Sequence, residues 1–233
     1  MTGLGTAINT AAIVAGGVLG LVFGRFLKPQ AQEALTKVCG LSTLCIALSG
    51  VLEQMAVLEN SALLIIGCLA LGTLVGELLN IEGGFERFGA WLKVKTHNTR
   101  DGGFVSAFVT ASLTVCIGAM AIVGSIQDGI SGDWSILATK AVLDLIIILV
   151  MTASLGKGAM FSAIPVAILQ GSVTLLAGLL KGALNESALA NLDLVGNVLI
   201  LGVGINLLFG NKLRVANMLP AILAAMVLGL FAG

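Results

Sequence analysis

Charge is scarce in this sequence. Only 10% of its 233 residues are Asp, Glu, Lys or Arg, while 58% are hydrophobic. A soluble domain carries roughly 25% charged residues to cover its surface. The formal net charge is zero and no basic tract with interleaved aromatics is present, which argues against a nucleic-acid surface. We therefore expect the lipid bilayer to be the main partner and expect no nucleic-acid partner.

Residues that serve catalysis or metal binding are also few. The single histidine, His97, has no companion at metal-ligand spacing, and there is no His-Glu-x-x-His, Gly-x-Ser-x-Gly or phosphate-loop motif. The four cysteines form no Cys-x-x-Cys pair and lie in or beside apolar runs, so we interpret them as small buried hydrophobic residues. These absences predict no enzyme activity, no metal and no cofactor.

Long apolar blocks are what the sequence does contain. They approach the ~20 residues that a helix needs to cross a hydrocarbon core of ~30 Å. They lack the alternation of barrel strands, and an open sheet edge has no partners in lipid. The sequence therefore predicts an all-α, polytopic transmembrane helical bundle that forms a single domain over residues 1–233. We expect about eight spans, at residues 7–26, 37–57, 62–80, 104–126, 135–154, 159–180, 192–210 and 214–232.

Lys and Arg segregate to alternate connections between these spans. Ten of the twelve lie in the first, third, fifth and seventh connections. Cytoplasmic loops carry an excess of Lys and Arg, so we expect these connections in the cytoplasm and both termini outside a bacterial inner membrane. In the third connection, residues 81–103, the spacing of Phe85, Phe88 and Trp91 predicts one short amphipathic helix at the cytoplasmic interface.

Glycine is abundant, and its spacing predicts closely packed helices. Four-residue steps join Gly16, Gly20 and Gly24 in the first span and Gly72 with Gly76 in the third. Eight spans of this length make a small unit, so we also expect a homodimer with glycine-rich contacts.

A weak parallel internal repeat is also suggested. Residues 21–28 resemble residues 207–214, and aligning Ser61 with Ser135 sets Ile66 and Ala70 opposite Lys140 and Asp144. The matches are short, so chance similarity stays open.

Two charged residues fall inside the fifth predicted span. Lys140 and Asp144 are four residues apart and emerge from one helix face. A charge inside the membrane costs about 2.5–3.5 kcal/mol on insertion scales, so such groups normally face a bundle interior or a wet cavity. One hypothesis is that Asp144 binds or relays a cation or proton while Lys140 balances its charge. The alternative is a structural ion pair that fixes helix packing.

Other polar residues lie within the predicted spans four, six and seven. Three glycines near the end of span four predict either a half-helix or re-entrant segment, or an ordinary exit turn. In span six, Pro165 predicts a kink, and the amide of Gln170 needs a partner near the membrane centre. Substrate coordination and interhelical hydrogen bonding both stay open for these groups. The further candidates for substrate or ion binding are Ser125, Gln127, Asp128, Ser162 and Asn206. Asn9 and Asn197 raise the same question, and all three asparagines rank below the other candidates.

The order of these motifs resembles a known family. The segments that carry the resemblance are 118–129, 139–144, 161–165, 170–172 and Leu219-Pro220. They are similar to the prokaryotic membrane family called domain of unknown function 554, and the similarity covers residues from about 9 to 220. It implies a multi-spanning membrane protein of a kind often labelled a transport protein, without an established substrate. Leu145 departs from the small residue expected after the aspartate.

Two functions are compatible with these observations. The first is a small secondary transporter or channel-like carrier for an ion or small solute, with a polar midplane site in spans four to six centred on Asp144. The second is a non-transporting membrane scaffold or partner subunit, in which the Lys140–Asp144 pair only specifies packing.

Overall fold

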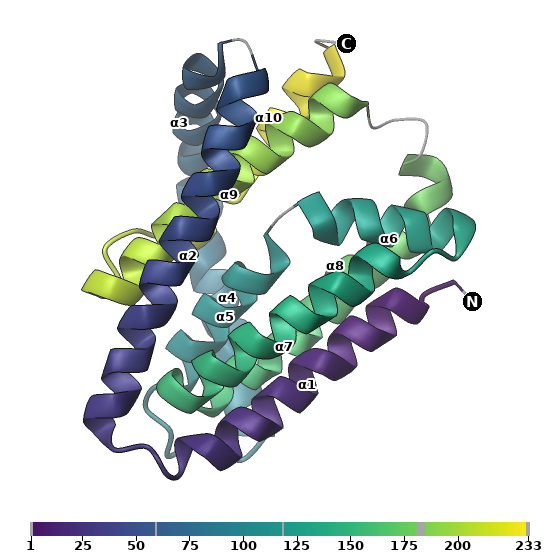
Figure 1. Cartoon of the computed structure of the whole chain (residues 1–233). Helices are drawn as coiled ribbons and strands as arrows, with labels where there is room; N and C mark the ends of the chain where they lie inside the picture. The colour runs from purple at the N-terminus through teal and green to yellow at the C-terminus, as the bar shows by residue number, and fades with distance from the viewer. Residues whose placement is uncertain (1, 59, 118, 181–184, 232–233) are drawn as a thin grey trace. The chain divides into compact units, whose positions relative to one another are not determined.

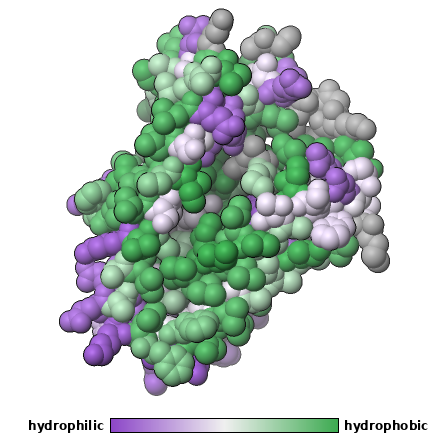
Figure 2. Space-filling view, in the orientation of Figure 1, coloured by the Kyte–Doolittle hydropathy of each residue, from purple (hydrophilic) through white to green (hydrophobic). Residues whose placement is uncertain are grey.

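All regular elements that the structure describes are helices (Figure 1). The computed structural model describes residues 2–58, 60–117, 119–180 and 185–231, and no strand occurs among them. A helix satisfies its own backbone groups, which a chain in lipid requires. Apolar side chains cover most of the visible surface in Figure 2, and Leu78, Leu175 and Phe231 are each at least 85% exposed. The predicted polytopic helical class is confirmed.

The number of spans depends on how two irregular regions are counted. Six helices are long and apolar enough to cross a membrane: Leu4–Gly24, Pro29–Val57, Ser61–Leu79, Ser135–Leu155, Lys157–Ala177 and Glu186–Phe209. A bent pair, Phe104–Cys116 with Met120–Ser131, makes a seventh if it counts as one span. The eighth predicted span corresponds to the shorter apolar helix Val215–Phe231. The second span begins at Pro29, earlier than the predicted residue 37.

The described chain divides into two compact units. Unit 1 comprises Met1–Cys39, Phe85–Cys116 and Met120–Leu180, and unit 2 comprises Gly40–Gly84, Ile117–Ala119 and Lys181–Gly233. A single membrane domain over residues 1–233 stays a prediction.

Unit 1 contains most of the predicted polar residues. Its elements are α1 (Leu4–Gly24), the start of α2 (Pro29–Val57), most of α4 (Ile81–Lys95), α5 (Phe104–Cys116), α6 (Ala119–Ser131), α7 (Ser135–Leu155), the 3-10 helix η1 (Lys157–Ser162) and α8 (Ala163–Leu180).

Glycines bring α1 and α7 into backbone contact. A Cβ atom at Gly16 would overlap the carbonyl oxygen of Leu145, and one at Gly20 would overlap that of Leu149. At Gly24 it would lie 3.2 Å from the backbone of Ala153. Both helices advance four residues from each contact to the next, so they run parallel, side by side in Figure 1. The predicted packing of these glycines is confirmed.

The fourth predicted span is broken. Instead of one helix over 104–126, α5 and α6 have 13 residues each and are bent by 62°. At 1.5 Å per residue each reaches only about 20 Å. Gly118, one of the glycines that suggested irregular backbone, lies outside the described residues. Of the two hypotheses for this segment, the structure has a half-helix arrangement, in which α6 brings the buried side chains of Ser125 and Asp128 into unit 1.

Proline does not kink the sixth span. Pro165 occupies the first turn of α8, where its missing N–H would have had no helical partner. The irregular backbone instead precedes the helix, as η1. Gly158 of η1 packs against the backbone of Phe104 and Phe108 at the start of α5.

The amphipathic helix predicted in the third connection is present as α4. The ring of Phe88 stacks on Trp91, with centroids 5.8 Å apart, and contacts Phe108 of α5 at the same distance. Leu92 is buried in the same aromatic cluster. Its place at the cytoplasmic interface stays a prediction.

Unit 2 comprises the remainder of α2, the start of α4, α3 (Ser61–Leu79), α9 (Glu186–Phe209), the 3-10 helix η2 (Val215–Met218) and α10 (Pro220–Phe231). Gly72 and Gly76 pack α3 against the backbone of Ala221 and Asn217. Small residues therefore serve close packing in both units.

Replacement of Gly16 by Ala should destabilise unit 1. The new methyl group meets the Leu145 carbonyl, and overpacking of this kind costs about 1–3 kcal/mol. Gly171→Ala in α8 is the matched control, since nothing lies within 4 Å of its Cβ position and Ala favours a helix over Gly by about 0.5–1 kcal/mol. Thermal unfolding in detergent should show a lower midpoint for Gly16→Ala alone. Equal midpoints would contradict the α1–α7 contact.

Candidate functional site

The charged residues of α7 form a closed ion pair. Lys140 Nζ donates to Oδ1 and Oδ2 of Asp144 at 2.9 and 2.8 Å. Their side chains are only 9% and 3% exposed. Direct pairing within one helix offsets part of the cost of burying both charges. The predicted proximity of the two residues on one helix face is therefore present as a buried, directly paired contact.

A third residue reaches this pair from α1. Asn9 Nδ2 donates to Asp144 Oδ2 at 3.0 Å. The Asn9 side chain is fully buried, and its Oδ1 accepts no hydrogen bond within the described chain. Asp144 thus receives donors from two helices, while one amide oxygen beside it stays unpaired.

Asp128 of α6 lies at the start of α1. Its Oδ2 accepts the backbone N–H of Gly5 at 3.0 Å, so a carboxylate faces the positive end of the α1 dipole, where negative charge is favourable. The side chain is 0% exposed, and Oδ1 has no partner among the described residues. A fixed carboxylate with one unsatisfied oxygen results.

The buried face of α8 adds two polar groups. The hydroxyl oxygens of Thr174 and Thr6 of α1 lie 3.4 Å apart. One turn earlier in α8, Gln170 is 1% exposed, and neither its Oε1 nor its Nε2 has a described partner. Because Gly17 of α1 packs against Met160 of η1, α1 and α8 run antiparallel. Gln170 therefore lies at about the depth of Asn9.

Together these side chains make one group, which we call the buried polar cluster. It consists of Thr6, Asn9, Asp128, Lys140, Asp144, Gln170 and Thr174. Its two carboxylates outnumber its one ammonium, so it carries a formal charge of −1 if all three are ionised. Acceptor oxygens and excess negative charge suit a cation or a proton better than an anion.

Comparison with known proteins places the chain among membrane proteins. The family model described as "Protein of unknown function (DUF554)" matches residues 4–230. The chain belongs to this family. It is 29% identical over 219 residues to "Uncharacterized membrane protein YdfK" of Bacillus subtilis (strain 168), covering 94% of this chain and 92% of that protein. It is also 29% identical over 229 residues to "Uncharacterized protein YqgA" of Escherichia coli (strain K12), covering 97% and 95%. No solved structure matches.

The other predicted site residues lie outside the hydrogen bonds of the cluster. Ser125 is buried but donates to the carbonyl of Ala121 in its own helix at 2.6 Å. Gln127, also on α6, is partly exposed. Ser162, at the end of η1, is fully buried, and its hydroxyl has no described partner.

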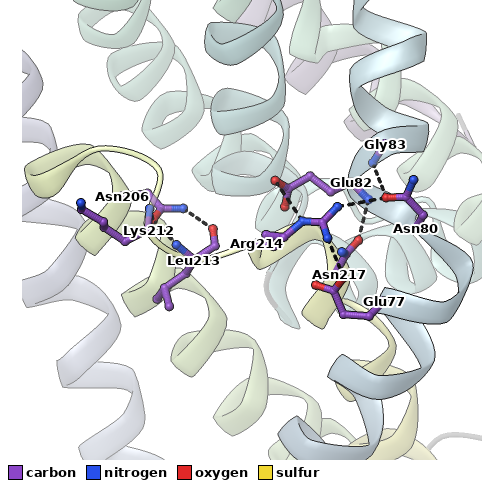
Figure 3. A network of polar contacts seen from close by, with 9 residues as sticks. All are labelled: Glu77, Asn80, Glu82, Gly83, Asn206, Lys212, Leu213, Arg214 and Asn217. Atoms are coloured by element: carbon purple, nitrogen blue, oxygen red, sulfur yellow. Dashed lines mark hydrogen bonds and ion pairs between the residues drawn. The ribbon is translucent and has the colours of Figure 1, made fainter.

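Asn206 belongs to unit 2 and has a structural environment (Figure 3). Its Oδ1 accepts the N–H groups of Lys212 and Leu213 at 2.9 Å each, and its Nδ2 donates to the Leu213 carbonyl at 2.7 Å. The side chain thus ties the end of α9 to the loop that follows. Its proposed role in substrate or ion binding stays a prediction.

The remainder of Figure 3 is an ion-pair network around Arg214. Its guanidinium donates to Glu77 Oε2 at 2.6 Å and to Asn80 Oδ1 at 3.0 Å. Asn217 accepts the N–H of Glu82 at 2.7 Å. The Arg214 and Glu77 side chains are 52% and 41% exposed, so solvent screens this pair and its contribution to stability is small.

Sequence reasoning underrated α1. Asn9 was ranked low, and Thr6 and the Gly5 amide were not singled out. The signal was available in the spacing, since residues 6, 9, 13, 16 and 20 follow one helix face and polar Thr6 and Asn9 continue the line of the glycines. A polar residue on a glycine-packed face is bound to meet the neighbouring helix.

Single and double replacements should reveal the coupling of Lys140 with Asp144. Lys140→Met leaves a buried carboxylate without its cation and should destabilise the protein by about 3–5 kcal/mol. The double variant Lys140→Met/Asp144→Leu removes both charges and should recover most of that loss. Thermal unfolding of the two single variants and the double variant measures the coupling. Additive effects would show that the two side chains do not pair.

Proposed function

We propose that the protein is a small secondary transporter or channel-like carrier for an ion or small solute, and not an enzyme. Its site is the buried polar cluster of unit 1, where Asp144 binds or relays a cation or a proton. The proposal includes a bacterial inner-membrane location with both termini outside. The parallel packing of α1 and α7 supports that threading, because the first and fifth predicted spans run in the same direction.

Unpaired polar atoms of the cluster carry this proposal. Asn9 Oδ1, Asp128 Oδ1 and both polar atoms of Gln170 are buried without described partners. Each buried unpaired polar group costs about 1–3 kcal/mol. Buried polar groups that only hold helices together are normally satisfied. A cluster that keeps several unsatisfied acceptors beside a carboxylate has the features of a site that pairs with a transported species.

A structural role is the second candidate function, and the closed Lys140–Asp144 pair favours it. Within the described chain both carboxylate oxygens of Asp144 have donors, as in a static packing contact. This account explains the ion pair, but it gives no reason for the unpaired amide of Gln170 or for the second oxygen of Asp128. We therefore place transport first.

A homodimer with glycine-rich contacts stays part of the proposal. Gly16, Gly20, Gly72 and Gly76 already pack within their own units, so a dimer interface would require other glycines. Gly67 and Gly171 have open space around their Cβ positions.

Transport can be tested in liposomes with Asp144 intact or replaced. We expect purified wild-type protein to mediate ion flux or ion-coupled solute flux, and Asp144→Asn to abolish it. Because this variant leaves the Lys140 ammonium without its carboxylate, its flux is compared only for protein whose unfolding midpoint shows that it is folded. Glu33→Gln removes an exposed carboxylate of α2 that pairs with Lys37 and is the matched control, with flux equal to wild type. If wild-type protein and Asp144→Asn were equally silent across a broad panel of ions and solutes, transport would be excluded.

Gln170 separates the two functions more sharply. Gln170→Leu replaces a buried unpaired amide by an apolar group of similar size, so it should leave the unfolding midpoint unchanged or raise it. A transport site should nonetheless lose flux. Ser172→Ala, on the exposed face of the same helix, should retain both. A Gln170→Leu variant that folds and transports as wild type would remove Gln170 from the site.

A further inference from the structure

The strongest unassigned feature of unit 1 is a cavity at the C-terminal ends of α1 and α7. Its volume is about 330 Å³, and α1, the start of α2, the turn before α5, α7 and η1 line it. It lies at the end of unit 1 that holds Arg25 and Lys157, the end expected in the cytoplasm. The buried polar cluster lies further along the same helix pair.

Thr152 is the buried polar group of this cavity. Its side chain is 2% exposed, and its Oγ1 has no hydrogen-bond partner in the described chain. Helical threonines usually donate to the carbonyl four residues earlier. Five others do so here, namely Thr10, Thr36, Thr96, Thr114 and Thr139. Thr152 is not among them, so its buried hydroxyl is left unpaired at the wall of the cavity.

One apolar layer separates Thr152 from the carboxylate. Asp144, Ile148 and Thr152 follow each other at four-residue spacing on α7, over about 12 Å of helix. Ile148 and Ile13 are both 0% exposed. On α7, Ile148 therefore separates Thr152 from Asp144, while Ile13 lies on the glycine face of α1 between Asn9 and Gly16, which contacts Leu145. The order along α7 is cavity, threonine, isoleucine and carboxylate.

The hydrogen bonds that Asp144 already accepts favour a proton over a metal ion at this site. A metal ion needs several oxygen ligands, but Lys140 and Asn9 already donate to the carboxylate at 2.8–3.0 Å. A proton needs no coordination shell and moves along hydrogen-bonded water. The hydrogen bonds at Asp144 therefore suit a proton better than a metal ion.

We propose, resting on the transport function above, that the ion is a proton and that this cavity is its inlet, with Thr152 as the last polar group before Ile148. Water in the cavity delivers the proton. An O–H bond forms at Asp144, the hydrogen bond from Lys140 to that oxygen breaks, and hydronium becomes water. The proton leaves Asp144 toward the end of the unit where Asp128 caps α1.

The titratable neighbours of Asp144 are few. Lys140 is on its own helix, Asp128 comes from α6, and Cys116 of α5 interacts electrostatically with both members of the pair. Neither α1 nor α8 has a charged residue, and η1 has only Lys157, which is exposed.

Proteoliposomes of phosphatidylethanolamine and phosphatidylglycerol with trapped pyranine test the inlet. A potassium diffusion potential set with valinomycin drives proton entry, and dye fluorescence gives the rate. Thr152→Val should lower the rate about tenfold, equivalent to a barrier about 1.4 kcal/mol higher. Thr139→Val, whose hydroxyl only bonds the Ser135 carbonyl, should match wild type. Ile148→Ser should raise the rate, and Ile148→Val should not. Unfolding midpoints confirm that each variant is folded.

The outcomes distinguish this inference from the proposed function. A wild-type protein that carries sodium or another solute without moving protons would overturn the proton inlet and leave transport standing. Proton flux that is unchanged in Thr152→Val and in Ile148→Ser would also overturn the inlet. A wild-type protein silent for protons and for the whole solute panel would overturn both.

Discussion

The close approach of α1 to α7 is the contact on which the rest of unit 1 depends. Glycines at three successive turns of α1 let its backbone lie against the carbonyls of α7. With this spacing the short side chain of Asn9 reaches Asp144, and the first turn of α1 comes within hydrogen-bond distance of Asp128. In lipid no hydrophobic force drives helices together, so such backbone contact is a main source of association. The contact that packs α1 against α7 therefore also brings the side chains of the buried polar cluster together.

Charge placement follows from this packing. An ammonium and two carboxylates can stay buried only where other protein groups replace water. The ion pair between Lys140 and Asp144 replaces water for both of these side chains. The backbone N–H of Gly5, at the start of α1, replaces water for one oxygen of Asp128. Within the buried polar cluster, the unsatisfied oxygens are on Asn9, Asp128 and Gln170, which come from three different helices. A site whose unmet acceptors come from different helices is sensitive to small relative helix movements, as a carrier requires.

The sequence was informative where one helix decides the outcome. Apolar length predicted the helices, four-residue spacing predicted both the glycine contacts and the Lys140–Asp144 pair, and the aromatic spacing of residues 85–91 predicted α4. It was less informative where several helices meet. The bend between α5 and α6, the position of Pro165 in the first turn of α8 and the role of Asn9 depend on tertiary neighbours that periodicity does not reveal. The local hydrogen bonding of Asn206 was also not foreseen, because its side chain bonds the backbone of the loop that follows α9. A polar residue in an apolar span can thus have a purely local partner.

The two units differ in the burial and the hydrogen bonding of their polar groups. The suggested repeat pairs Lys140 and Asp144 with Ile66 and Ala70, but the latter are exposed on α3, so the aligned positions do not share an environment. The Arg214–Glu77 pair of unit 2 is about half exposed, and Asn206 there has donors and acceptors matched to the loop. In unit 1 the charges are buried and several polar atoms are left unpaired, whereas in the described part of unit 2 one such atom, Asn217 Nδ2, is unpaired. Stability alone would favour the arrangement of unit 2. The free-energy cost of the buried charges and unpaired polar atoms in unit 1 is therefore the physical reason to place the function there.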